Sequence, residues 1–152
     1  MTEESAFLKV GHIGVIVRDL DRAVEYYESL GIGPFEPPQN VTASARKVGG
    51  KPIFPDAIKL KAKIAKQSPV WLQLIQPVEG ESLFKEFLKT KGEGVNHLGF
   101  HVDDIEKEEA RLVEKGLTVL YSSRFVKGGG VVNFDTRKVG GVLFELIQWP
   151  SE

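Results

Sequence analysis

The chain has 152 residues, of which 41% are hydrophobic, enough for one sizeable core or for two small modules that share one. Its 20 basic and 21 acidic side chains leave a formal net charge of -1, which disfavours nucleic acid and anionic membrane surfaces as partners. The absence of cysteine excludes disulfides, a thiolate nucleophile and cysteine metal ligands. Neither a signal peptide nor a long apolar span is visible, so we expect a cytoplasmic protein with no membrane contact.

The first segment predicts a strand followed by a helix. Residues 10–17 (VGHIGVIV) alternate in the manner of a half-buried strand. Asp19 can cap the helix that follows, apolar residues recur at helical spacing after it, and Gly31 ends the pattern.

The middle of the chain predicts a long loop and two strands. Residues 37–55 contain several prolines and glycines and are expected to form a loop that could cover a site. Residues 58–65 (IKLKAKIA) alternate strictly, and residues 70–76 (VWLQLIQ) give a further strand. A polar connection at 80–94 is expected to include a short helix at 83–88.

The second half begins again with a strand and a capped helix. Residues 95–102 (VNHLGFHV) alternate like the first strand, Asp104 is the next candidate cap, and Gly116 closes that helix. A strand after three glycines lies within 124–136, and residues 142–148 (VLFELIQ) form the last strand.

These segments match as an internal repeat. A shift of 85 residues places His12 on His97 and Gly14 on Gly99, and a shift of 72 places Gln73 on Glu145. The shifts differ by thirteen residues, which we assign to the expected loop. The sequence therefore predicts one α+β domain over 1–152, made of two pseudo-repeats at about 8–78 and 93–150, each a strand, a helix and three further strands.

Each repeat offers an imidazole on its first strand and an oxygen donor on its last. A histidine on a strand is usually structural, but the correspondence of His12 with His97 and of Gln73 with Glu145 favours a shared site. Glu145 also interrupts an apolar run, and a carboxylate is costly to bury without a partner. Two imidazoles, an amide and a carboxylate suit a divalent ion such as Zn, Co, Ni, Mn or Fe, with room for water or substrate. His101 shares the face of His97 and is expected to form a hydrogen bond at the rim.

Three motifs resemble the vicinal oxygen chelate superfamily, which includes glyoxalase I, methylmalonyl-CoA epimerase, extradiol dioxygenases and antibiotic-resistance proteins. They are HIGVIVRDLDRAVEYYESLGIGPF, GEGVNHLGFHVDDI and GGVLFELIQ, and QLIQPVEGES before GEGVNH is most similar to the methylmalonyl-CoA epimerases. The resemblance covers nearly the whole chain. It implies two tandem βαβββ modules that form a curved mixed sheet around a central metal cleft, a homodimer, and His12, Gln73, His97 and Glu145 as metal ligands.

Residues and resemblance together predict an isomerase, epimerase or lyase that acts on a small oxygenated substrate. A divalent ion would stabilise the enolate that forms when a proton leaves the carbon next to a carbonyl. Glu145 is expected to be both ligand and catalytic base. Acyl-CoA and glutathione thioesters are candidate substrates, and no organic cofactor is expected.

The sequence departs from the epimerase pattern in one respect. The related enzymes have a glutamate on the strand before Gln73 as a second acid–base group, but PDAIKLKAKIAK contains none. Asp56, Lys59 and Lys61 are the available substitutes, although the lysines also fit one solvated strand face. A single-base reaction is also compatible with this sequence.

Two alternatives have other chemistry. An Fe(II)-dependent dioxygenase would use two histidines and one glutamate, and Gln73 as an additional ligand argues against it. A non-catalytic binding or resistance protein would instead use an apolar cleft, for which the candidate side chains are Trp71, Phe35, Phe54 and Tyr121.

Overall fold

The computed structural model describes residues 5–151, which form ten strands, three α-helices and a short 3-10 helix. In chain order these are β1 (Val10–Ile16), α1 (Leu20–Ser29), β2 (Phe35–Glu36), β3 (Ala43–Val48), β4 (Lys51–Ile53), η1 (Pro55–Ala57), β5 (Lys59–Ala65), β6 (Trp71–Glu79), α2 (Leu83–Lys91), β7 (Gly94–His101), α3 (Ile105–Glu114), β8 (Val119–Phe125), β9 (Gly130–Phe134) and β10 (Leu143–Gln148).

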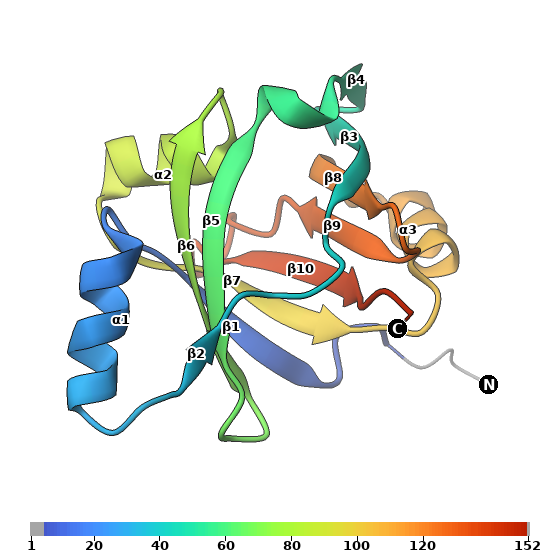
Figure 1. Ribbon diagram of the computed structural model, residues 1–152. Helices are drawn as coiled ribbons and strands as arrows, with labels where there is room; N and C mark the ends of the chain where they lie inside the picture. Colours follow the sequence, from blue (N-terminus) through green and yellow to red (C-terminus); the bar gives the residue numbers. More distant parts are fainter. Residues whose placement is uncertain (1–4, 152) are drawn as a thin grey trace.

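All the strands belong to one curved mixed sheet with the order β2-β5-β6-β1-β7-β10-β9-β8-β3-β4 (Figure 1). In the first half β1 runs parallel to β6, and in the second half β7 runs parallel to β10. The halves meet where β1 pairs antiparallel with β7. The predicted α+β fold, with tandem modules in a curved mixed sheet, is confirmed.

The two long helices begin where the sequence predicts. The Asp19 carboxylate accepts a hydrogen bond from the Arg22 backbone N–H at 3.1 Å, and Asp104 accepts one from Lys107 at 3.1 Å. Helix α1 packs on β5 and β6, whereas α3 packs on β9 and β10. The two helices therefore cover the outside of the sheet at opposite ends, as Figure 1 shows.

Both faces of the central strands are buried. Val15 and Leu74 belong to a cluster beneath α1, and Phe134 belongs to a corresponding cluster beneath α3. A third cluster, which includes Ile16 and Phe84, fills part of the concave face and joins α2 to the sheet. Ile16 is fully buried, so the core is not confined to the helix-covered face that the alternating pattern assigned to it.

The prediction of a loop over 37–55 is wrong for its second half, which contains β3 and β4. Strand β3 crosses from the first half to the far edge of the second half and pairs antiparallel with β8. The prolines and glycines of this stretch suggested a loop. The burial of β3 also does not follow the alternating pattern by which a strand is predicted. Pairing with β8 provides hydrogen-bond partners for an edge that would otherwise be exposed.

Within residues 5–151, none of the helices has both the length and the apolar character that a membrane span requires.

We expect Phe134→Ala to lower the free energy of unfolding by about 3–5 kcal/mol, since it leaves a cavity in a packed core. Phe134 is fully buried and its ring contacts that of Phe7 edge-on, with centroids 6.4 Å apart. Urea denaturation followed by circular dichroism measures the change. Val139→Ala is the control: Val139 is 86% exposed, and the expected change is within about 0.5 kcal/mol. Equal losses in the two variants would contradict this description of the core.

Candidate metal centre

The pairing of β1 with β7 brings two histidine rings together. In this register His12 lies opposite Gly99, and Gly14 lies opposite His97. A Cβ atom on Gly99 would lie 1.8 Å from His12 Cε1, and one on Gly14 would lie 2.0 Å from His97 Cε1. Each glycine thus leaves the space that the opposite imidazole occupies. The repeat aligned these glycines, but sequence reasoning gave them no role.

Glu145 completes a compact cluster from β10. The His12 Nε2 atom lies 3.2 Å from Glu145 Oε1 and 3.3 Å from His97 Nε2. The His97 Nε2 atom lies 3.4 Å from Glu145 Oε2. All three side chains are buried, and together they could hold a metal ion, since their donor atoms lie within 4.8 Å of one another.

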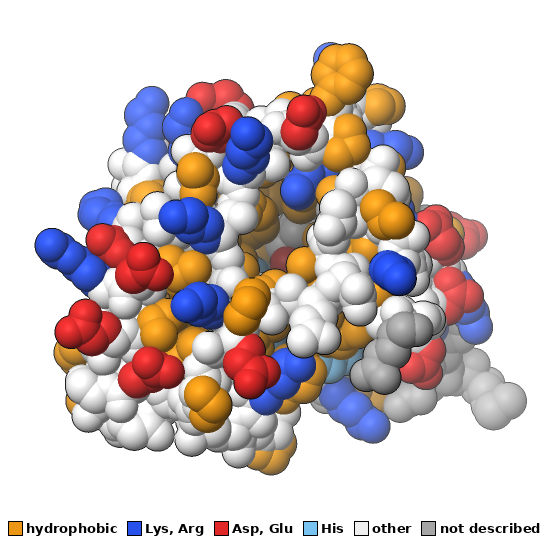
Figure 2. Space-filling model, in the orientation of Figure 1, with side chains coloured by type: hydrophobic (Ala, Val, Ile, Leu, Met, Phe, Trp, Pro, Cys, Tyr) orange, Lys and Arg blue, Asp and Glu red, His pale blue; other side chains and the backbone are white. Residues whose placement is uncertain are grey.

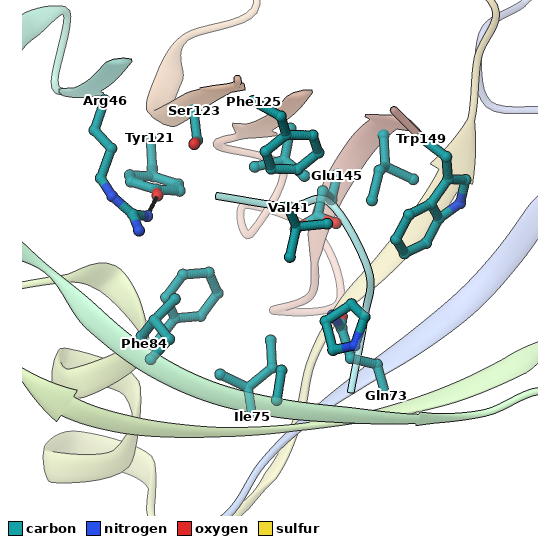
Figure 3. Close-up of a pocket in the computed structure, with 15 residues that line it drawn as sticks. Val41, Arg46, Gln73, Ile75, Phe84, Tyr121, Ser123, Phe125, Glu145 and Trp149 are labelled. Atoms are coloured by element: carbon teal, nitrogen blue, oxygen red, sulfur yellow. Dashed lines mark hydrogen bonds between the residues drawn. The ribbon is translucent and has the colours of Figure 1, made fainter. Parts of the chain in front are cut away.

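Gln73, the fourth predicted ligand, lies on β6 beside Gly14 and lines the same cavity as Glu145 (Figure 3). Its Oε1 atom is buried and has no hydrogen-bond partner among the described residues. A buried amide oxygen without a partner is costly, and a cation would satisfy it. The geometry is therefore compatible with Gln73 as a fourth donor.

Two asparagines hold this cluster in place. The Nδ1–H of His97 donates to Asn96 Oδ1 at 2.9 Å, which leaves the lone pair of Nε2 directed at the cluster. The Asn133 amide donates to Glu145 Oε2 at 3.1 Å. Sequence reasoning missed both residues. Asn133 could have been found, because it interrupts an apolar strand in the same way that Glu145 does.

The buried cluster shifts the pKa of two of its members. Burial lowers the pKa of His97 to about 4; the charge of Glu145 opposes this shift, whereas His12 adds to it. Burial raises the pKa of Glu145, but the neighbouring His97 and His12 and the hydrogen bond from Asn133 outweigh it and hold the pKa below its usual value. A neutral imidazole and an ionised carboxylate are the forms that bind a divalent cation, so the donor set fits such an ion.

A cavity of about 320 Å³ opens beside Glu145 and Gln73, and Figure 2 shows a hollow in this face of the molecule. Figure 3 shows Glu145 and Gln73 at one end of the cavity, and Arg46 and Tyr121 at the other. The wall between them is mainly apolar. The lining residues are Pro38, Val41, Arg46, Leu60, Ala62, Gln73, Ile75, Phe84, Tyr121, Ser123, Phe125, Val131, Glu145, Ile147 and Trp149.

The predicted substitutes for a second acid–base group do not line this cavity. Asp56, Lys59 and Lys61 border a neighbouring depression, whereas Leu60 and Ala62 of the same strand face the cavity. The alternation along β5 thus turns the lysines away from the metal cluster, in agreement with the solvated strand face that they also fit.

The aromatic residues expected to form an apolar cleft are also dispersed. Tyr121 lines the cavity, but Phe35 is buried beneath α1, Phe54 is 82% exposed, and Trp71 borders another depression. His101 accepts a hydrogen bond from Trp149 Nε1 at 3.2 Å, so its predicted place at the rim, outside the ligand cluster, is confirmed.

A family model described as the Glyoxalase/Bleomycin resistance protein/Dioxygenase superfamily matches residues 11–134. The chain therefore belongs to this superfamily, as its motifs suggested. No curated protein sequence matches the chain.

Solved structures with the same fold include methylmalonyl-CoA epimerases. The enzyme from Mycobacterium tuberculosis is 26% identical, with a TM-score of 0.67 over 100% of this chain and 94% of that chain. A Streptomyces coelicolor epimerase variant, in complex with 2-nitronate-propionyl-CoA, is 24% identical, with a TM-score of 0.68 over 94% and 98%. A hypothetical protein from Bacillus halodurans is 21% identical, with a TM-score of 0.67 over 95% and 96%.

We expect Gly99→Ala to weaken the binding of a divalent ion by at least about tenfold, because the added methyl group displaces the His12 ring. Isothermal titration calorimetry with Zn²⁺ or Co²⁺ measures the affinity. Gly11→Ala is the matched control on β1, since its Cβ atom would instead displace His101, at 2.4 Å from Nε2. A Gly99 variant with the parent affinity would show that the ring position does not matter.

We expect the metal-free protein to lose about 3 kcal/mol of stability as the pH falls from about 6.5 to about 4. Folding lowers the pKa of His97, so the unfolded chain takes up the proton first. The stabilisation is therefore complete above the unfolded pKa and is lost as the pH falls through the folded one. Urea titrations of chelator-treated protein across this range measure the slope. His97→Asn should flatten it, and an unchanged slope would assign the effect to other groups.

Proposed function

We propose that this protein is a metal-dependent isomerase or lyase that removes a proton from the carbon next to a carbonyl in a small oxygenated substrate. In this proposal His12, Gln73, His97 and Glu145 hold the divalent ion, and Glu145 is the catalytic base. The observation that carries it is the cluster of two imidazoles and one carboxylate, whose Glu145 borders a mainly apolar cavity.

A bound divalent ion would supply positive charge that stabilises the enolate formed by proton removal. Glu145 is suited to take the proton, because the neighbouring histidines and Asn133 hold its pKa below the usual value despite burial, and its side chain lines the cavity. His12 and Asn133 contact different oxygens of this carboxylate and fix its orientation. The apolar wall excludes water from a carbanionic species that water would protonate.

The cavity wall favours a reaction with one carboxylate base. Among the described lining residues, the groups that carry or exchange a proton as acids or bases are Glu145, Arg46 and Tyr121. An arginine stays protonated and does not act as a base at neutral pH. In the isomerase reaction Glu145 therefore removes the proton and returns it to another position of the substrate. In the lyase reaction a leaving group departs after Glu145 has removed the proton. Neither reaction needs a second carboxylate on the opposite face of the substrate.

Acyl thioesters are the substrate class to test first. The similar epimerase structures include one in complex with methylmalonyl-CoA and others with 2-nitronate-propionyl-CoA. Glutathione thioesters remain in the proposal as the second class. The cytoplasmic location and the homodimer expected from the sequence stay predictions.

Iron-dependent oxygenation is the second candidate, because two histidines and one carboxylate with open positions form the ligand set of non-haem Fe(II) oxygenases. Gln73 favours the first candidate, since its unpartnered oxygen at the same cavity offers a fourth donor. Oxygen consumption by Fe(II)-loaded protein, tested with catechols, distinguishes the two.

We expect metal-reconstituted protein in D₂O to exchange the α-proton of one or more 2-substituted acyl-CoA or α-hydroxycarbonyl compounds, as followed by proton NMR. Glu145→Gln keeps an oxygen ligand but loses basicity, so exchange should fall by about 10²- to 10⁴-fold while the metal content is retained.

Glu79→Gln is the matched control, because Glu79 lies at the end of β6 with an exposed side chain that pairs with Lys59. It should leave exchange unchanged. A Glu145→Gln variant that exchanges at the parent rate would remove Glu145 from the catalytic role, and oxygen uptake without exchange would favour the second candidate.

A further inference from the structure

The end of the cavity opposite the metal cluster carries one positive charge. Arg46 reaches it from β3, and Figure 3 shows the guanidinium extending into the space between Tyr121 and Phe84. Its Nε–H donates to the Pro55 carbonyl at 2.7 Å, and one Nη1–H donates to the Tyr121 hydroxyl. These two contacts fix the plane of the guanidinium and leave further N–H donors for a ligand.

No carboxylate of residues 5–151 forms an ion pair with Arg46, although other arginines of the chain have acidic partners. Arg46 is half-buried in a wall that is otherwise mainly apolar, where an uncompensated charge is unfavourable. The planar fork of a guanidinium matches a carboxylate, with which it forms two parallel hydrogen bonds. A ligand carboxylate would thus supply the partner that the chain itself does not.

Tyr121 supports the same anion. Its ring packs edge-on against Phe84, with centroids 5.9 Å apart, and the residue is buried. Burial raises the pKa of the Tyr121 hydroxyl, against the opposing effect of Arg46, so the group stays protonated at neutral pH. Because Arg46 donates to its oxygen, the hydroxyl hydrogen can point towards an acceptor in the cavity, where Ser123 also lies beside it.

We propose that the substrate carries a carboxylate that binds Arg46 and Tyr121, while its reacting carbonyl lies at the metal cluster. The second half of this statement rests on the proposed function. The mainly apolar wall between the two ends, which includes Ile75 and Phe84, requires a hydrocarbon segment between the carboxylate and the carbonyl. The substrate class is therefore a small carboxylic acid, free or as the acyl part of a thioester, with two polar ends and an apolar middle.

Paired hydroxamates test this proposal. A hydroxamate offers two neighbouring oxygens to a divalent ion, and its tail can end either in a carboxylate or in a methyl group. The monohydroxamates of succinic, glutaric, adipic and pimelic acid are compared with alkyl hydroxamates of the same length by calorimetry on metal-reconstituted protein. At one chain length we expect the acid to bind about 10- to 100-fold more tightly than its alkyl partner.

Arg46→Met should abolish this preference and leave the affinity for the alkyl hydroxamate within about twofold of the parent value. Arg46→Lys, which keeps the charge but loses the planar fork, should retain part of it, and Tyr121→Phe should reduce it several-fold. Lys47→Met is the control, because it removes a charge from the neighbouring, exposed position of β3.

The carboxylate site would be overturned if the acid and alkyl hydroxamates bound with equal affinity at every chain length. It would also be overturned if the tighter binding of the acid survived Arg46→Met. These outcomes differ from failure of the proposed function. In that case the acid preference would remain, but removal of the metal with a chelator would leave the affinity of both probes unchanged.

Discussion

The antiparallel register of β1 and β7 determines where every other part of the candidate metal centre lies. His12 lies opposite Gly99 and His97 lies opposite Gly14, so each imidazole occupies the volume that a side chain on the other strand would take. A slip of one strand by one residue would turn its ring to the opposite face of the sheet and separate the two imidazoles. Glu145 reaches the same point only because β10 is parallel to β7, with Glu145 opposite Gly99.

This arrangement places polar groups where a sheet protein would otherwise place aliphatic ones. Glu145 and both histidines are buried, and the buried Gln73 oxygen has no partner among the described residues. Such a cluster costs stability unless its members compensate one another or bind a cation. The surrounding core therefore has to be well packed, and the clusters beneath α1 and α3 provide that support on the opposite face of the sheet. The same central strands thus carry the polar cluster on one face and the packed core on the other.

Much of the fold and the position of the candidate ligands could be predicted from the sequence, because both depend on local patterns and on the internal repeat. Alternation located β1 and β7, and Asp19 and Asp104 marked the helix starts. The alignment of Gln73 with Glu145 singled out two oxygen donors that now lie at one cavity.

The remaining features depend on long-range pairing, which no local pattern encodes. Strand β3 lies near the edge of the sheet, between β8 and β4, and has mostly exposed side chains, so its sequence shows no alternation of apolar and polar residues. Its partner is β8, more than seventy residues away, and only that pairing brings Arg46 beside Tyr121. The roles of Gly14 and Gly99 likewise became visible only when β1 and β7 were in register.

The crossing of β3 also breaks the internal twofold symmetry of the molecule. A cleft built from two identical halves would present equivalent environments on either side of the internal twofold axis. A molecule would then bind equally well in either of two orientations. Here the first half contributes two additional strands, β3 and β4, and β3 carries the positively charged Arg46. A guest with unlike ends then has two inequivalent orientations in the cavity. The longer copy of the internal repeat thereby adds to the asymmetry that the unlike side chains Gln73 and Glu145 already give the cavity.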